Sequence, residues 1–243
     1  MERFARYVAI GDSSTEGLDD PDGAGGYRGW ADRLAARAAV LYANLAVRGK
    51  LARQIRDEQL GPAVEMRPDL ATVFAGSNDL LARRFDPAAL EEDVARTQRA
   101  LVSAGAVTLT FTLPDLTGVM PFGRLLRPRV RAMNDALRRA SAASGARLVD
   151  VAAHPVGSDR RLWSEDRFHV NAEGHARIAA ALGEALGFPG DEAWSRPLPP
   201  DPRSALACGW DDLRWIGRHL LPFARGGGRG APRGPKRPRL TPV

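Results

Sequence analysis

A serine near the start of the chain follows a short apolar run, at a position where it could act as a nucleophile. The run Val8–Ile10 ends abruptly in Gly11-Asp12-Ser13, which is typical of a buried strand that stops at a loop. In parallel α/β sheets, ligands bind at the carboxyl ends of the strands. A nucleophilic serine also needs a histidine base, a carboxylate that orients this base, and hydrogen-bond donors for an oxyanion. Ser13 is therefore a candidate nucleophile if other segments supply these groups.

One of the four histidines has a carboxylate at a suitable spacing. His169 lies in a polar loop, three residues after Asp166, and residues three apart face the same side of a helical turn. The Asp166 carboxylate can then hold one imidazole nitrogen while the other faces Ser13, which fixes the tautomer and stabilises the imidazolium. His175 lies early in a predicted helix and is interpreted as structural, whereas His219 is predicted to face solvent.

Two further loops are predicted to lie at the same edge of the sheet. Gly49 follows the second predicted strand, and Asn78 follows the third in Gly76-Ser77-Asn78-Asp79. The backbone N–H groups of Ser13 and Gly49 and the side-chain amide of Asn78 would make three donors for a developing oxyanion. Each segment alone is typical of an ordinary turn, and only their joint placement favours catalysis.

Two other kinds of site can be compared with this interpretation. Asp166, His169 and His175 could be ligands of a metal ion, but no fourth ligand is evident in the sequence. The α/β-hydrolases also order their residues Ser, Asp, His, but they need a Gly-x-Ser-x-Gly elbow. No such pentapeptide occurs in this chain, so neither alternative is favoured.

The elements that must position these residues alternate along the chain. Apolar runs predict strands at residues 6–10, 40–47, 70–75, 106–113 and 147–151. Helical patterns fall at residues 30–39, 51–60, 87–103, 129–144 and 172–186. This alternation predicts an α/β fold with three α/β/α layers, in which helices cover both faces of a five-stranded parallel sheet. A flavodoxin-like strand order is the expectation among doubly wound folds.

The remainder of the chain differs in composition from this body. We predict a domain at 1–188, a Pro-rich connector at 189–204, a C-terminal helix packed on the body at 205–224, and a disordered basic tail at 225–243. Trp210 and Trp215 are expected to contribute to the packing of the C-terminal helix. The tail is rich in Gly, Pro and Arg, a composition that cannot bury a core.

Composition limits the classes of protein that need to be considered. The 44% hydrophobic and 26% charged residues are ordinary for a globular protein. The net charge of +6 comes from six basic residues after residue 224, where no acidic residue occurs, so the body is neutral. Cys208 is the only cysteine, which excludes an internal disulfide. Without a secretory segment or a long apolar run, the sequence predicts a cytoplasmic location.

Taken together, these motifs resemble the signature blocks of the SGNH (GDSL-type) esterases and lipases. Gly11-Asp12-Ser13, Gly49, Gly76-x-Asn78-Asp79 and Asp166-x-x-His169 occur in the order of the four blocks. The resemblance implies Ser13 as nucleophile, His169 as base, Asp166 as its orienting carboxylate, and Ser13, Gly49 and Asn78 as oxyanion donors. It also implies a flavodoxin-like fold and ester hydrolysis through an acyl-enzyme. In the second block this chain has Ala46 where many members have another glycine.

The expected function is hydrolysis of an acyl or acetyl ester of a lipid, sugar or small molecule. No cofactor and no metal is expected, and the expected partner is the ester substrate alone, with weak contacts of the tail to anions. Two alternatives stay open: a non-catalytic binding relative of the same fold, and a nucleic-acid-associated protein that acts through its basic tail. The substrate stays open because specificity lies in the loops.

Overall fold

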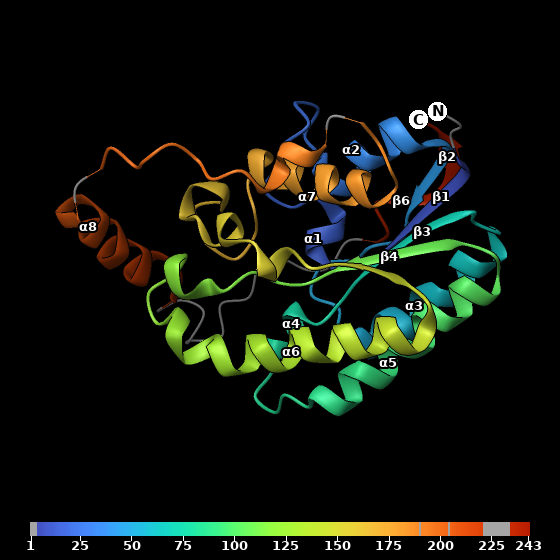
Figure 1. The fold of residues 1–243 in the computed structure, drawn as a ribbon, viewed down its shortest axis with the longest axis horizontal. Helices are drawn as coiled ribbons and strands as arrows, with labels where there is room; N and C mark the ends of the chain where they lie inside the picture. Colours follow the sequence, from blue (N-terminus) through green and yellow to red (C-terminus); the bar gives the residue numbers. More distant parts are fainter. Residues whose placement is uncertain (1–3, 190, 204, 221–233) are drawn as a thin grey trace.

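The structure is a computed structural model that describes residues 4–189, 191–203, 205–220 and 234–243. Its centre is a six-stranded sheet in the order β5-β4-β3-β1-β2-β6 (Figure 1). The strands are β1 (Phe4–Gly11), β2 (Ala39–Asn44), β3 (Leu70–Phe74), β4 (Val107–Phe111), β5 (Arg147–Val149) and β6 (Arg237–Pro242). The first five are parallel, and β6 is antiparallel to β2. The predicted α/β class and flavodoxin-like order are thus confirmed, with one strand more than expected.

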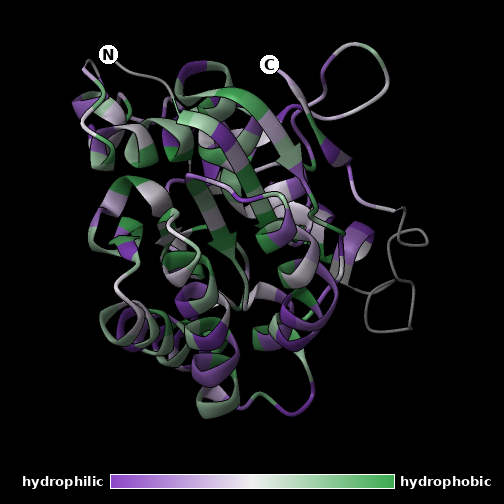
Figure 2. Ribbon diagram, turned by 90° about the vertical axis from the view of Figure 1, so that its right-hand side faces the viewer, coloured by the Kyte–Doolittle hydropathy of each residue, from purple (hydrophilic) through white to green (hydrophobic). Residues whose placement is uncertain are grey.

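Helices cover both faces of the sheet. One face carries α2 (Gly29–Ala38) and α7 (Ala172–Ala185), and the other carries α3 (Ala52–Glu65), α5 (Pro87–Ser103) and α6 (Gly123–Ser144). The sheet is mostly hydrophobic, whereas the outer sides of the helices carry hydrophilic residues (Figure 2). The three layers therefore bury one continuous core.

Local sequence signals set several helix ends. Asp86 caps α5 by accepting from the N–H groups of Ala88 and Ala89, with Pro87 at the first helical position. Gly145 ends α6 with φ of 80°, a conformation in which glycine avoids the clash of a side chain. The sequence pattern predicts these two ends because capping depends on neighbouring residues alone.

Two helices extend several residues beyond their predicted bounds. Helix α3 runs through Pro62 to Glu65, and α6 begins at Gly123, ahead of Pro128. A proline inside a helix removes one backbone hydrogen bond, and packing can outweigh this loss. Beyond Pro62, Ala63 is fully buried in the core, so tertiary contacts continue α3 past the local stop signal.

The predicted disordered tail is wrong for its last residues. Residues 237–242 form β6 and pair with β2, which would otherwise be an edge of the sheet. Lys236 forms an ion pair with Asp32 at 2.6 Å, and the Arg237 guanidinium lies 5.3 Å from the centre of the Tyr42 ring. A composition poor in apolar residues did not prevent order, because an open strand edge supplied backbone hydrogen bonds. Residues 225–233 lie outside the described part of the chain.

The C-terminal segment consists of α8 (Ala205–Trp215) and a single π-helical stretch, η6 (Ile216–Leu220). The expected packing of both tryptophans is only half right. Trp215 is 9% exposed, but Trp210 is 58% exposed and Leu213 is 61% exposed. Helix α8 lies at the end of the molecule beyond the carboxyl ends of the strands (Figure 1).

No helix in the described ranges of the chain has both the length and the apolar character needed to cross a membrane.

Candidate active site

The end of β1 places Ser13 at the carboxyl edge of the sheet. A Cβ on Gly11 would lie 2.7 Å from the Phe74 carbonyl oxygen, so only glycine lets β1 pass so close to β3. Asp12 then caps the short helix α1 (Ser13–Glu16) by accepting from the Ser14 N–H at 3.0 Å. Ser13 is thereby the first residue of α1, and Asp12 alone separates it from the end of β1.

Ser13, His169 and Asp166 form one hydrogen-bonded chain. Ser13 Oγ lies 2.7 Å from His169 Nε2, and His169 Nδ1 lies 2.8 Å from Asp166 Oδ2. The His169 N–H also donates to Asp166 Oδ1 at 3.0 Å, which closes the turn between them. The structure therefore brings together three of the residues that the sequence selects, although Ser13 and His169 are 156 positions apart.

The charge state of Asp166 suits it to orient an imidazole. Burial by itself would raise the pKa of Asp166, but hydrogen bonds from His169 and Ser164 and attraction to His169 outweigh it. The pKa of Asp166 therefore lies well below its usual range, and the carboxylate stays ionised at neutral pH. An ionised carboxylate at this place holds Nδ1 protonated and leaves Nε2 as an acceptor for the Ser13 hydroxyl proton.

Two residues beside the hydrogen-bonded series Ser13–His169–Asp166 have no signal in the sequence, namely Ser164 and Asp19. The Ser164 hydroxyl can donate its hydrogen to Asp19 Oδ2, at 2.7 Å, or to Asp166 Oδ1. Asp19 Oδ2 in turn lies 3.9 Å from His169 Nδ1. The carboxylates of Asp19 and Asp166 thus both lie beside Nδ1 of the His169 ring. Asp19 belongs to a loop that is distant in sequence from the other two residues.

His175 does not join these residues. Its Nδ1 accepts from the Trp30 N–H at 3.2 Å, and its Nε2 donates to the Leu18 carbonyl at 3.0 Å. Burial lowers the pKa of His175 to about 4, so the ring is neutral and bridges α7 to the loop after α1. Asp166, His169 and His175, the metal set that the sequence did not favour, are therefore not brought together, and the structural interpretation of His175 holds.

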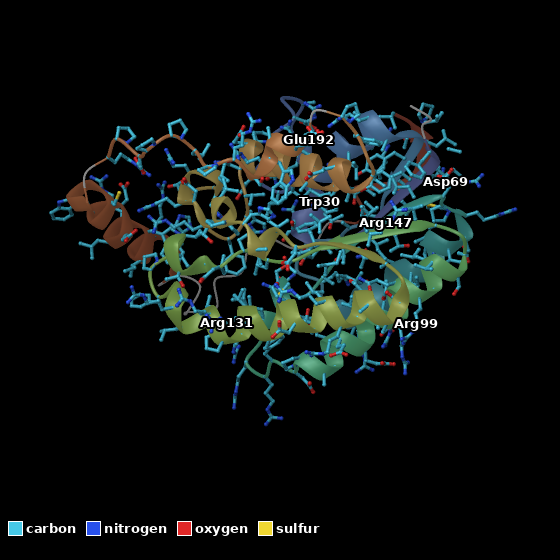
Figure 3. The ribbon with its side chains drawn as sticks, in the orientation of Figure 1. Trp30, Asp69, Arg99, Arg131, Arg147 and Glu192 are labelled. Carbon is cyan, nitrogen blue, oxygen red and sulfur yellow. The ribbon has the colours of Figure 1, made fainter. Side chains whose placement is uncertain are left out.

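Ser14, the neighbouring hydroxyl, faces a different partner from Ser13. The indole Nε1 of Trp30 donates to Ser14 Oγ at 3.4 Å. Trp30 is fully buried between α2 and the sheet (Figure 3), with its ring perpendicular to that of Phe111. Ser14 thus contacts the core, and Ser13 is the hydroxyl that meets the histidine.

The three predicted oxyanion donors are in two different states. Gly49 has φ of 79°, a left-handed conformation that favours glycine. Among the described residues, no acceptor takes the N–H of either Ser13 or Gly49. Asn78, by contrast, donates both amide hydrogens, to Asp12 Oδ2 at 3.1 Å and to the Lys50 carbonyl at 3.0 Å. Asn78 is at the site, but it must release one bond before it can bind an oxyanion.

Asp12 links the first and third sequence blocks. Its Oδ2 accepts from Ser77 Oγ at 2.8 Å as well as from Asn78. Burial raises the pKa of Asp12 to about 6, although hydrogen bonds from Ser77 and the Ser14 backbone act in the opposite direction. Asp12 is therefore a structural partner of the loop that carries Asn78.

All five predicted site residues open onto one cavity of about 870 Å³. Aromatic and aliphatic side chains dominate the rest of its lining, from Phe74 and Phe111 at the sheet to Trp215 in the C-terminal segment. A cavity of this size can enclose a molecule of several hundred daltons.

The chain is similar to proteins of one family. A model of the GDSL-like Lipase/Acylhydrolase family matches residues 9–177. Among solved structures, esterase EstA from Pseudoalteromonas sp. is 15% identical with a TM-score of 0.59, over 75% of this chain and 96% of that chain. The lipase/acylhydrolase from Enterococcus faecalis is 20% identical with a TM-score of 0.59, over 81% and 99% of the two chains.

A third structure, a member of the lipolytic protein G-D-S-L family from Veillonella parvula, is 20% identical with a TM-score of 0.60, over 75% of this chain and 98% of that chain. At such identities these similarities establish the fold. No curated protein sequence matches the chain.

Proposed function

The chain belongs to the GDSL-like lipase/acylhydrolase family and is a hydrolase of ester bonds, and we propose that Ser13 is its nucleophile. The observation that carries this proposal is the unbroken hydrogen-bonded chain from Ser13 Oγ through the His169 ring to Asp166. A serine in such a chain can lose its proton to the imidazole as it attacks a carbonyl carbon.

The proposed reaction has two halves. In the first, Ser13 Oγ attacks the ester carbonyl while His169 Nε2 takes the hydroxyl proton, and Asp166 stabilises the imidazolium. His169 then gives this proton to the leaving alcohol, and an acyl-enzyme remains on Ser13. In the second half, a water molecule loses its proton to His169 and attacks the acyl group, which releases the acid and restores Ser13.

The oxyanion of each tetrahedral intermediate is proposed to bind to the Ser13 and Gly49 N–H groups. Both donors lack a protein acceptor among the described residues, so they lose no existing bond when the oxyanion forms. Asn78 would be the third donor, after one amide hydrogen leaves Asp12 or Lys50. Donors held in place before the reaction stabilise developing charge without reorganisation.

Labelling by a fluorophosphonate tests the proposal directly. The probe forms a covalent bond with an activated serine, and esterase EstA is inhibited by monoethylphosphonate. We expect stoichiometric labelling at Ser13, identified by peptide mass, and none in Ser13→Ala. Ser13→Ala should also lower turnover of p-nitrophenyl butyrate by at least ~10³-fold, whereas the matched Ser14→Ala should stay within about fivefold. Absent labelling would contradict the proposal and favour a non-catalytic binding relative, whereas labelling unaffected by Ser13→Ala would show that another residue is the nucleophile.

The contacts of the tail do not favour the nucleic-acid alternative. Lys236 is paired with Asp32, and Arg237 lies over Tyr42, so these cations are engaged with the body. We propose a small ester as the partner of this chain. The cytoplasmic location stays a prediction from the sequence.

A further inference from the structure

The segment formed by α8 and η6 lies outside the match to the family, which ends at residue 177. It nevertheless contacts the loop that carries Asp166 and His169. The indole Nε1 of Trp215 donates to the Asp166 backbone carbonyl at 3.0 Å, and this bond is buried. An element beyond the family core therefore binds the backbone of the proposed catalytic carboxylate.

A second contact of this segment fixes the residue after Asp166. Arg167 has φ of 57°, a left-handed conformation that is unfavourable for residues other than glycine. The Arg167 guanidinium pairs with Asp212 of α8 at 2.6 Å and lies 5.5 Å from the centre of the Trp215 ring. Arg160 also pairs with Asp212, at 3.3 Å. The turn that brings Asp166 toward His169 is thus clamped by α8.

The same segment closes one side of the cavity. Trp215 and His219 line it, and their rings are stacked with centroids 6.1 Å apart. His219 is therefore partly buried at the cavity, which corrects the prediction that it faces solvent. Met120 and the first residues of α6, among them Leu126, also line the cavity.

The lining favours an apolar ligand over a charged or sugar ligand. Each cation that lines the cavity already has a carboxylate partner among the described residues. These pairs are Arg48 with Glu16, Lys50 with Glu58, Arg177 with Glu173, and Arg218 with Glu165. An acetyl group would leave most of the apolar lining in contact with water, whereas a longer acyl chain would cover it.

We propose that this cavity binds the acyl chain of the ester and that the segment 205–220 forms its outer wall. In this proposal, which rests on Ser13 being the nucleophile, Trp215 has two effects. Its ring limits the acyl site, and its N–H positions Asp166. Each buried methylene should raise kcat/KM by about fourfold until the cavity is filled.

The first experiment measures kcat and KM for p-nitrophenyl esters from acetate to palmitate. Octanoate has six methylenes more than acetate, so at about fourfold for each buried methylene we expect kcat/KM to rise by roughly 4,000-fold between the two esters. Ser13-dependent hydrolysis that is fastest for acetate would overturn the acyl site and leave the proposed function standing. Failure of every ester together with failure of fluorophosphonate labelling would instead overturn the proposed function.

The second experiment separates the two effects of Trp215. Trp215→Phe keeps an aromatic wall but removes the N–H, so kcat should fall about tenfold at every chain length with KM little changed. Trp215→Ala should in addition raise KM for octanoate more than KM for acetate. The matched control is Trp210→Phe, on the same helix but exposed, and it should alter neither constant more than twofold.

If Trp215→Phe leaves kcat as unchanged as Trp210→Phe does, Trp215 does not position Asp166. If Trp215→Ala raises KM equally for all chain lengths, Trp215 does not form the wall of the acyl site. Because Trp215→Ala removes a buried ring, its folding is checked by circular dichroism. If it fails to fold, Trp215→Leu, which keeps an apolar side chain but shortens the wall, replaces it as the test of the wall. Asp212→Asn, which removes the charge that holds Arg167, tests the clamp separately, with an expected fall in kcat. An unchanged kcat in Asp212→Asn would overturn the clamp.

Discussion

The side-chain amide of Asn78 donates to the carboxylate of Asp12, the residue immediately before the proposed nucleophile, at 3.1 Å. This bond ties the loop after β3 to the loop after β1, and it occupies a group that the sequence motif assigns to the oxyanion. The resting site therefore holds two open backbone donors and one side-chain donor that is already engaged.

Asn78→Ala should lower kcat for p-nitrophenyl butyrate by about 10²–10³-fold, because an oxyanion donor is lost from the transition state. The matched control is Ser77→Ala, which removes the other donor to Asp12 without removing an oxyanion donor. It should lose less than about tenfold. A loss below fivefold in Asn78→Ala would remove Asn78 from the oxyanion site.

Asp166→Asn should lower kcat by about 10³–10⁴-fold, since an amide can hold the His169 ring in the wrong tautomer. The nearby carboxylate Asp19 provides the control. Asp19 lies 3.9 Å from the ring nitrogen, against 2.8 Å for Asp166, so Asp19→Asn should lose less than about tenfold. Equal losses in steady-state assays of both variants would mean that the two carboxylates share the orienting role.

Asp12→Asn should change how stability depends on pH. The pKa of Asp12 is raised from 3.8 to about 6, so the folded protein keeps a proton that the unfolded chain has released between these values. The stability from Asp12 is therefore fully present below pH 3.8 and is lost as the pH rises through 6. Urea unfolding at pH 4 to 7 should show a fall of about 2 kcal/mol in the wild type relative to the variant. Parallel profiles for the two proteins would show that Asp12 titrates normally.

Removal of residues 237–243 should lower the melting temperature by roughly 5 °C, equivalent to about 2 kcal/mol. The deletion exposes the edge of β2 and removes the contact of Arg237 with Tyr42. The control is Arg239→Ala, an exposed residue of the same strand, which should stay within about 0.5 kcal/mol. A truncated protein that melts with the full chain would show that β6 adds no stability. Calorimetry measures the melting temperature of both variants.

Sequence reasoning succeeded where the relevant physics is local. Strand and helix periodicity reports which face of an element is buried, so the five parallel strands follow from it. The spacing of Asp166 and His169 places both in one turn, and the caps at Asp86 and Gly145 depend only on their neighbours. The prolines at positions 62 and 128 are local signals too, but they predicted the wrong helix bounds, because tertiary packing outweighed the lost backbone hydrogen bond.

The sequence by itself determined the class of fold and brought Ser13, Asp166, His169, Gly49 and Asn78 forward as candidates. Only the tertiary structure decided that Asn78 binds Asp12, that Asp19 approaches the His169 ring, and that the last residues pair with β2. It also decided that Trp215 is buried and Trp210 is exposed, although both are tryptophans of one helix. Each of these contacts joins segments far apart in the chain, and its energy depends on burial and on partners that no short stretch of sequence contains.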